Sequence, residues 1–174
     1  ADERAQLQRF TATETAPLAQ ARCVHQLFED QVRRTPDAIA LLDGDVQLSY
    51  AALDARANRL AHRLHKLGVG PESRVALYLP RGIEQVVALL ATLKAGAAYL
   101  PLDPDLPDER LAFLLADSRP RVVLTCGELR ERLQSMGSAL QSISVLTLDT
   151  DAHTELDDPG APSVPGLCPD NLAY

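Results

Sequence analysis

Apolar positions along the chain switch repeatedly between the period of a strand and the period of a helix. Four nearly continuous apolar runs are typical of strands buried on both faces of a sheet, and they span residues 74–79, 99–102, 122–125 and 143–148. Helical spacing predicts helices between these runs, over 83–93, from Pro107 onward and near 128–134. Strands that alternate with helices form βαβ units, so the sequence predicts the α/β class, with a largely parallel sheet covered by helices.

The segment before the first of these strands predicts two more helices and a hairpin. An amphipathic pattern from His25 to Val32 stops before Pro36, as helices tend to do. Two short strands, 38–42 and 46–48, flank Gly44, and Asp-Gly between apolar runs is a hairpin signal. Ser49 is a good N-cap for a helix over 50–67. One face of that helix is apolar and carries Leu53, Ala57, Leu60, Leu64 and Leu67.

The two ends of the chain have a different composition. Residues 1–22 show no sustained amphipathic period, so we expect a linker there and a domain over 23–174. Residues 150–170 are polar and contain Pro159, Pro162, Pro165 and Pro169, which indicates an exposed loop.

Composition narrows the class of protein. Of the 174 residues, 46% are hydrophobic and 24% charged, as in soluble globular proteins. No apolar run is long enough to span a bilayer, and the first residues do not resemble a signal peptide, so we expect no membrane association. With 24 acidic and 17 basic residues the net charge is −7, which argues against nucleic-acid binding. The cysteines Cys23, Cys126 and Cys168 are odd in number and widely spaced, which favours a reduced, cytoplasmic protein.

Lys94 is a polar residue on the apolar side of its predicted helix. We expect its amine either to extend toward solvent or to bond the terminal carbonyls of that helix. A catalytic lysine is the less favoured alternative. Gly96 follows the helix end, where glycine relieves backbone strain.

Other candidate side chains have structural explanations. His62 and His65 have metal-like spacing, but we expect His62 on a solvated basic face. We expect His25 to pack or cap its helix, Cys126 to be an inert core thiol, and His153 to lie in the loop. A cluster of acidic residues could suggest magnesium, but turn and helix-dipole roles account for its members, Asp103, Asp105 and Asp108.

Three motifs together resemble the adenylation domains of nonribosomal peptide synthetases. They are LSYAAL at 48–53, LKAGAAYLPLDP at 93–104 and the closing PDNLAY at 169–174, preceded by HQLFEDQ at 25–31. Ala52 stands where the family usually has Glu, and Leu100 and Leu102 replace other apolar residues; neither change removes chemistry. The resemblance implies that 1–22 is a linker from a condensation domain and that 23–174 is the N-terminal portion of the adenylation domain.

The family activates an amino acid with Mg-ATP and passes it to the phosphopantetheine thiol of a carrier protein. In the family, the loop that holds ATP would begin just after Tyr174. The resemblance therefore carries no catalytic, cofactor-binding or metal residue onto this chain, and it implies that the chain alone is inactive. We also expect Tyr174 to lie within a strand, which would leave an exposed sheet edge.

Two alternatives remain. One is an acyl- or aryl-CoA ligase, which shares the fold and the adenylating half-reaction. The other is a non-catalytic segment that docks a partner, because some adenylation domains bind a small MbtH-like helper protein; residues 116–121 are the candidate surface.

Overall fold

The computed structural model describes residues 21–137, 143–148 and 160–174. Their centre is a four-stranded sheet in which all paired strands are parallel, in the order β4-β3-β5-β6. The strands are β3 (Arg74–Tyr78), β4 (Ala98–Leu102), β5 (Val122–Thr125) and β6 (Ser144–Thr147). This confirms the predicted α/β class. Most of the predicted linker, and part of the predicted loop with His153, lie outside the described residues.

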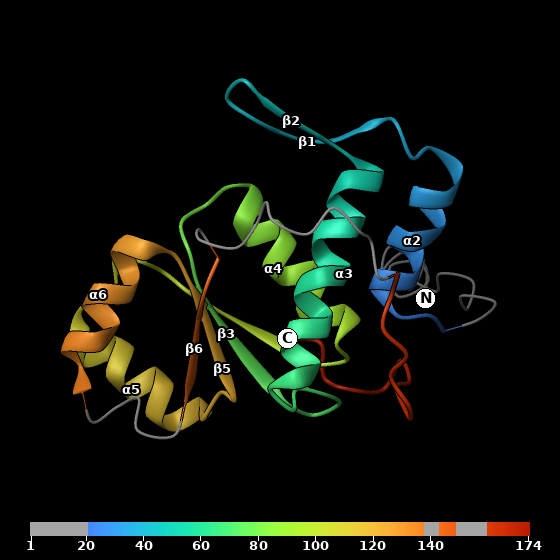
Figure 1. The fold of residues 1–174 in the computed structure, drawn as a ribbon. Coiled ribbons are helices and arrows are strands. Elements are labelled where there is room, and N and C mark those ends of the chain that lie inside the picture. Colours follow the sequence, from blue (N-terminus) through green and yellow to red (C-terminus); the bar gives the residue numbers. More distant parts are fainter. Residues whose placement is uncertain (1–20, 138–142, 149–159) are drawn as a thin grey trace, which may run out of the picture.

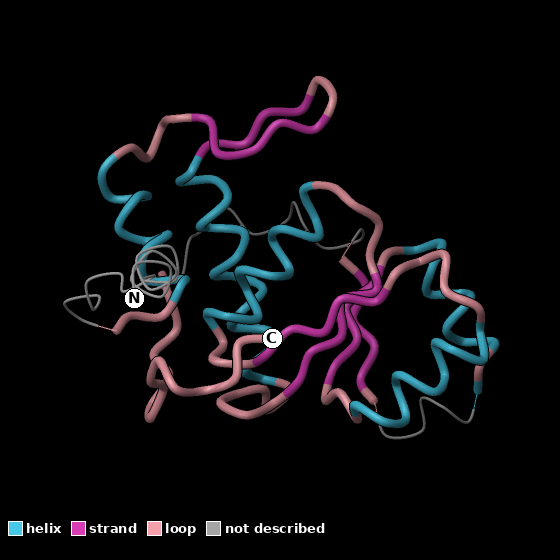
Figure 2. Tube along the Cα trace, turned by 180° about the vertical axis from the view of Figure 1, so that it is seen from behind, coloured by secondary structure: helices cyan, strands magenta, loops and turns pink. Residues whose placement is uncertain are grey.

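Helices cover both faces of this sheet. The reason is that the chain first moves from β3 to one edge of the sheet and then crosses back toward the other edge. Helix α4 (Ile83–Lys94) leads from β3 outward to β4, and α5 (Asp108–Ser118) leads back past β3 to β5. Right-handed crossovers that run in opposite directions place their helices on opposite faces. Accordingly α5 and α6 (Gly127–Ser135) lie on one side of the sheet and α4 on the other, as Figures 1 and 2 show.

The alternation of β3 residues builds two separate cores. Val75 and Leu77 pack with the helices α3 (Tyr50–Lys66) and α4, whereas Ala76 and Tyr78 pack with α5 and α6. Successive side chains of a strand point to opposite faces, so a fully apolar strand can serve both cores. All four of these side chains are at most 1% exposed.

The N-terminal segment wraps the α4 side of the sheet. Helix α2 (Val24–Arg34) leads into the hairpin of β1 (Ile39–Asp43) and β2 (Val46–Ser49), which projects away from the sheet (Figure 1). Helix α3 follows, and its N-cap is the predicted one, since the Ser49 hydroxyl accepts a hydrogen bond of 3.2 Å from the Ala52 N–H.

The predicted apolar face of α3 is correct except at its end. Its other members are buried, but Leu67 is 36% exposed. The chain turns at Gly68, which has a φ of +75°, and Val69 donates its N–H to the Leu64 carbonyl at 3.0 Å. Because this Schellman-type end reverses the chain, Val69 takes the buried place instead of Leu67.

The C-terminal residues 160–174 lie against the end of α4 and the edge strand β4. Gly96 has a φ of +80°, and a Cβ built there would stand 2.8 Å from the Val164 side chain.

The prediction that Tyr174 lies within a strand is wrong. The Ala173 carbonyl accepts a bond of 3.1 Å from the Tyr99 N–H, but a turn at 168–171 precedes it and no strand pairing is established there.

Candidate functional site

The carboxyl ends of parallel strands are where ligands bind in open α/β sheets, so a site is expected at this edge. Arg132 of α6 occupies it. Its guanidinium donates to the Tyr78 hydroxyl at 2.9 Å, to the Pro104 carbonyl at 2.5 Å and to the Asp108 carboxylate at 2.8 Å. These bonds hold the turn after β4 against the end of β3. Burial raises the pKa of Tyr78, which keeps its hydroxyl protonated.

The acidic residues near this edge have structural roles. The Asp103 carboxylate accepts the Asp105 N–H at 3.0 Å, which is a local turn bond. Asp108 lies in the first turn of α5 and pairs with Arg132. Among the residues that the structure describes, no group of three His, Cys, Asp or Glu side chains could hold a metal ion. The turn role expected of Asp103 and the helix-start position expected of Asp108 are therefore found in the structure.

Lys94 does neither of the two things expected of it. It is 2% exposed, and its amine lies between the carboxylates of Glu29 from α2 and Asp54 from α3, at 3.0 Å from the Asp54 Oδ1. The expectation of solvent or carbonyl contacts is wrong because the two other helices bring carboxylates to the end of α4. The Asp54 Oδ2 in turn accepts a bond of 3.0 Å from Asn58.

This buried cluster ties three helices together. A charge that is removed from water needs a partner, and here one ammonium group faces two carboxylates. The Lys94 amine and the Asp54 Oδ1 form an ion pair, but their geometry is not that of a hydrogen bond. The lysine therefore fixes the packing of α2 and α3 on α4.

His25 packs at the start of α2, as expected, and is 8% exposed. Burial lowers the pKa of His25 below its usual 6.5; the charge of Lys94 lowers it further, while Glu29 opposes the shift. The folded protein therefore prefers the neutral ring. Its contribution to stability is complete above about pH 6.5 and is lost as the pH falls through the folded-state pKa.

A pH experiment tests this contribution of His25. We expect the urea midpoint of the wild-type chain to fall more steeply from pH 7.5 to 5 than that of His25→Phe, which fills the space but cannot titrate. Both chains share the remaining titrating groups, so the difference between them isolates His25. Equal slopes would contradict the buried, neutral histidine.

His62, His65 and Cys126 each make a local contact with the surrounding structure. His62 is half-buried, and its ring Nε2 is 3.1 Å from the Gly160 carbonyl, so the expected solvated position is wrong. The reason is that the C-terminal segment covers this side of α3. His65 contacts the Ala95 carbonyl at 3.2 Å. Cys126 is partly buried and packs against the core after β5.

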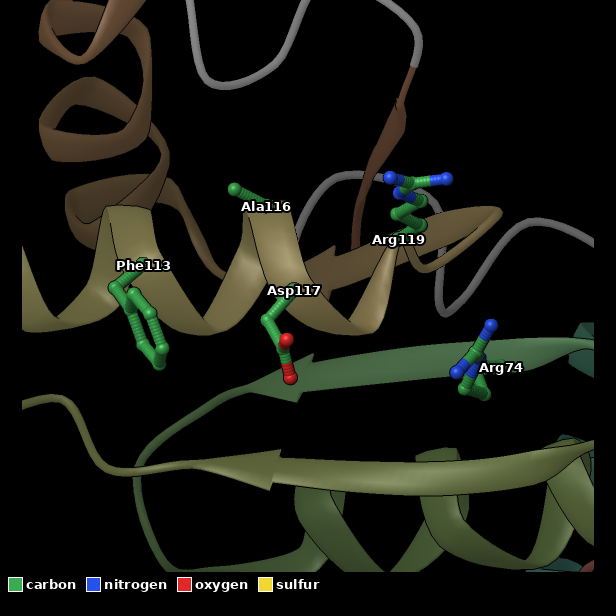
Figure 3. A pocket seen from close by; sticks show the side chains of 5 residues that line it. All are labelled: Arg74, Phe113, Ala116, Asp117 and Arg119. Atoms are coloured by element: carbon green, nitrogen blue, oxygen red, sulfur yellow. The ribbon is translucent and has the colours of Figure 1, made fainter.

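An open depression lies between α5 and the start of β3. Phe113, Ala116 and Asp117 line it from α5, Arg119 follows the helix end, and Arg74 comes from β3 (Figure 3). Phe113 is 57% exposed, with the Arg110 guanidinium 5.2 Å from its ring centre. The surface thus combines an apolar ring with charges of both signs. It shares Ala116, Asp117 and Arg119 with the predicted partner surface at 116–121.

Sequence reasoning missed the two polar networks at the ends of the helices. Lys94 stands out in the sequence because it interrupts an apolar face, but its partner Glu29 is 65 positions away. Arg132 gives no comparable signal, since an arginine in a short polar helix is ordinary. Its partner Tyr78 is 54 positions away.

The described residues thus form an α/β fold with a parallel four-stranded sheet. A model of the family described as "AMP-binding enzyme" matches residues 28–174, and the chain belongs to that family. It is 45% identical over 155 residues to a linear gramicidin synthase protein of Brevibacillus parabrevis, a match that covers 89% of this chain and 2% of that protein.

Solved structures agree with this assignment. The nonribosomal peptide synthetase FmoA3 superposes with a TM-score of 0.81 at 33% identity, over 93% of this chain and 18% of that one. The anthranilate CoA ligase AuaEII superposes with a TM-score of 0.70 at 20% identity, over 75% of this chain and 26% of that one, which shows the fold alone. These matches confirm the resemblance to peptide-synthetase adenylation domains.

Proposed function

We propose that this chain is the N-terminal scaffold of an adenylation domain that activates an amino acid with Mg-ATP. The parent protein would release pyrophosphate, hold an aminoacyl-adenylate and pass the aminoacyl group to the phosphopantetheine thiol of a carrier domain. The observation that carries the proposal is the match to FmoA3, whose superposed form holds an α-methyl-L-serine adenylate. The chain itself spans only a few per cent of the first curated relatives' lengths, for example 2% and 3%.

The proposed role of the described residues is structural support. We assign no contact with ATP, magnesium or the amino acid to any of them, and residues 1–22 are proposed to link an upstream condensation domain. None of the described helices is long and apolar enough to cross a membrane. The three free cysteines support the proposed cytoplasmic location.

The test is carboxylic-acid-dependent ATP–pyrophosphate exchange by the proposed parent protein. Exchange driven by one amino acid supports the proposal and identifies the substrate. Exchange driven only by fatty or aryl acids would move the protein to the acyl- or aryl-CoA ligases, an alternative that the comparisons do not favour. Silence with every acid, also after co-expression with a helper protein, would contradict an activating domain.

The depression at α5 is the proposed docking surface for an MbtH-like helper. Its exposed ring and its guanidinium groups suit a partner that offers an apolar side chain and a carboxylate. We expect Ala116→Asp to weaken co-purification of the helper about tenfold, because a charge would enter the apolar part of the contact. Gln134→Glu, an added charge on exposed α6, is the control. Equal binding by both variants would remove this surface from consideration.

A further inference from the structure

The turn between α3 and β3 contains a residue in an unfavourable conformation. The Ser73 N–H donates to the Gly70 carbonyl at 3.0 Å, Pro71 takes the second position and Glu72 the third, with a φ of +63°. This is the type II turn, whose third position favours glycine because a side chain strains the backbone there. Among the described residues, only one other non-glycine residue, Arg119, has a positive φ.

The Glu72 side chain shows what the strained position achieves. Its Oε1 accepts a bond of 2.9 Å from the Asn171 Nδ2 and a longer one of 3.4 Å from the Leu172 N–H. The two segments are 99 positions apart. Backbone strain of this kind persists where the surrounding structure requires it, and here the turn points the carboxylate at the C-terminal segment.

Asn171 is held from two sides at once. Its Oδ1 accepts the Cys168 N–H at 2.8 Å, and its own N–H donates to the Cys168 carbonyl at 3.1 Å. This closed turn leaves the amide Nδ2 for Glu72. The amide therefore bridges the 168–171 turn and the 70–73 turn.

Beyond this bridge the chain lies beside the edge strand. The Ala173 carbonyl accepts the Tyr99 N–H at 3.1 Å, and the ring centres of Tyr99 and Tyr174 are 5.3 Å apart. Figure 1 shows this end of the chain beside the sheet and α3. Glu72 therefore fixes the position from which the chain aligns with β4.

We propose that Glu72 is a positioning residue that sets the path of the chain along β4 into the nucleotide-binding loop. The part of the inference that concerns the nucleotide rests on the proposed function and on the family resemblance, which implies that the ATP loop begins just after Tyr174. Glu72 touches no substrate; it acts through Asn171 and Leu172.

Glu72→Gly in the parent protein separates positioning from stability, because glycine relaxes the turn while it deletes the carboxylate. We expect hydrogen exchange of the Tyr99 amide to accelerate, and the KM for ATP to rise about three- to tenfold, as for one exposed hydrogen bond, with kcat nearly unchanged. The unfolding midpoint is expected to stay the same or rise. Glu72→Gln keeps the acceptor oxygen and should keep most of the affinity.

A donor–acceptor exchange gives a rescue test. Asn171→Asp places two carboxylates together and should reproduce the Glu72→Gly effect, whereas Asn171→Asp combined with Glu72→Gln restores one donor and one acceptor and should recover the KM. Unchanged exchange at Tyr99 in Glu72→Gly would overturn the proposal, as would faster exchange with an unchanged KM. Wild-type protein without any pyrophosphate exchange would instead refute the proposed function. Hydrogen exchange of the Tyr99 amide would still test whether Glu72 positions the C-terminal segment.

Discussion

Replacement of Lys94 with Met is expected to lower the free energy of unfolding by about 3–5 kcal/mol. Methionine fills a similar volume, so the loss is electrostatic: the carboxylates of Glu29 and Asp54 would remain close together in a poorly solvated site without a counter-charge. Urea unfolding followed by circular dichroism measures the effect.

The control for Lys94→Met is Arg33→Met, which breaks the ion pair between Arg33 and Asp30. The Arg33 side chain is 66% exposed. We expect a much smaller loss there, since exposed pairs contribute little. Asp54→Asn should recover part of the loss in the Lys94→Met background, because it removes one of the two unpaired charges. A Lys94→Met chain as stable as Arg33→Met would contradict the buried cluster.

Replacement of Tyr78 with Ala is expected to cost about 3–5 kcal/mol, the range for a deleted core aromatic side chain. Tyr78 is 0% exposed and belongs to the core that joins β3 to α5 and α6. The same denaturant titration measures this loss.

Tyr78→Phe divides this loss into its two parts. It keeps the ring but removes the hydroxyl that accepts from Arg132, and should cost about 1–2 kcal/mol. Phe113→Ala is the matched control on α5, because its ring is 57% exposed. If Tyr78→Phe lost as much as Tyr78→Ala, the ring would contribute nothing and the packing described for this core would be wrong.

The sequence predicted the elements well where burial alone determines them. The run at 122–125 coincides with β5, because a strand covered on both faces is apolar at every position. Ser49 and Gly96 marked helix ends through local chemistry, and the structure confirms both of them. Helical spacing predicted Leu67 on the buried face of α3, but Leu67 is exposed. The reason is that the chain reverses at Gly68 before Leu67 can pack on the core.

The polar networks could not be predicted because their partners are distant in sequence. Helical period shows that Lys94 faces the core, but it does not show which carboxylates the core offers. His62 is covered by residues that follow it by 98 positions. The hydrogen bond between Glu72 and Asn171 could not be predicted either, because nothing in the sequence links the two turns.

We propose that the described residues are scaffold and that nucleotide chemistry is supplied elsewhere in the parent protein. Calorimetric titration of the 174-residue chain with Mg-ATP tests it most directly, after circular dichroism has shown the chain to be folded. We expect no saturable heat for this chain and saturable binding for the same chain extended through the downstream loop. Saturable ATP binding by the 174-residue chain would contradict the claim.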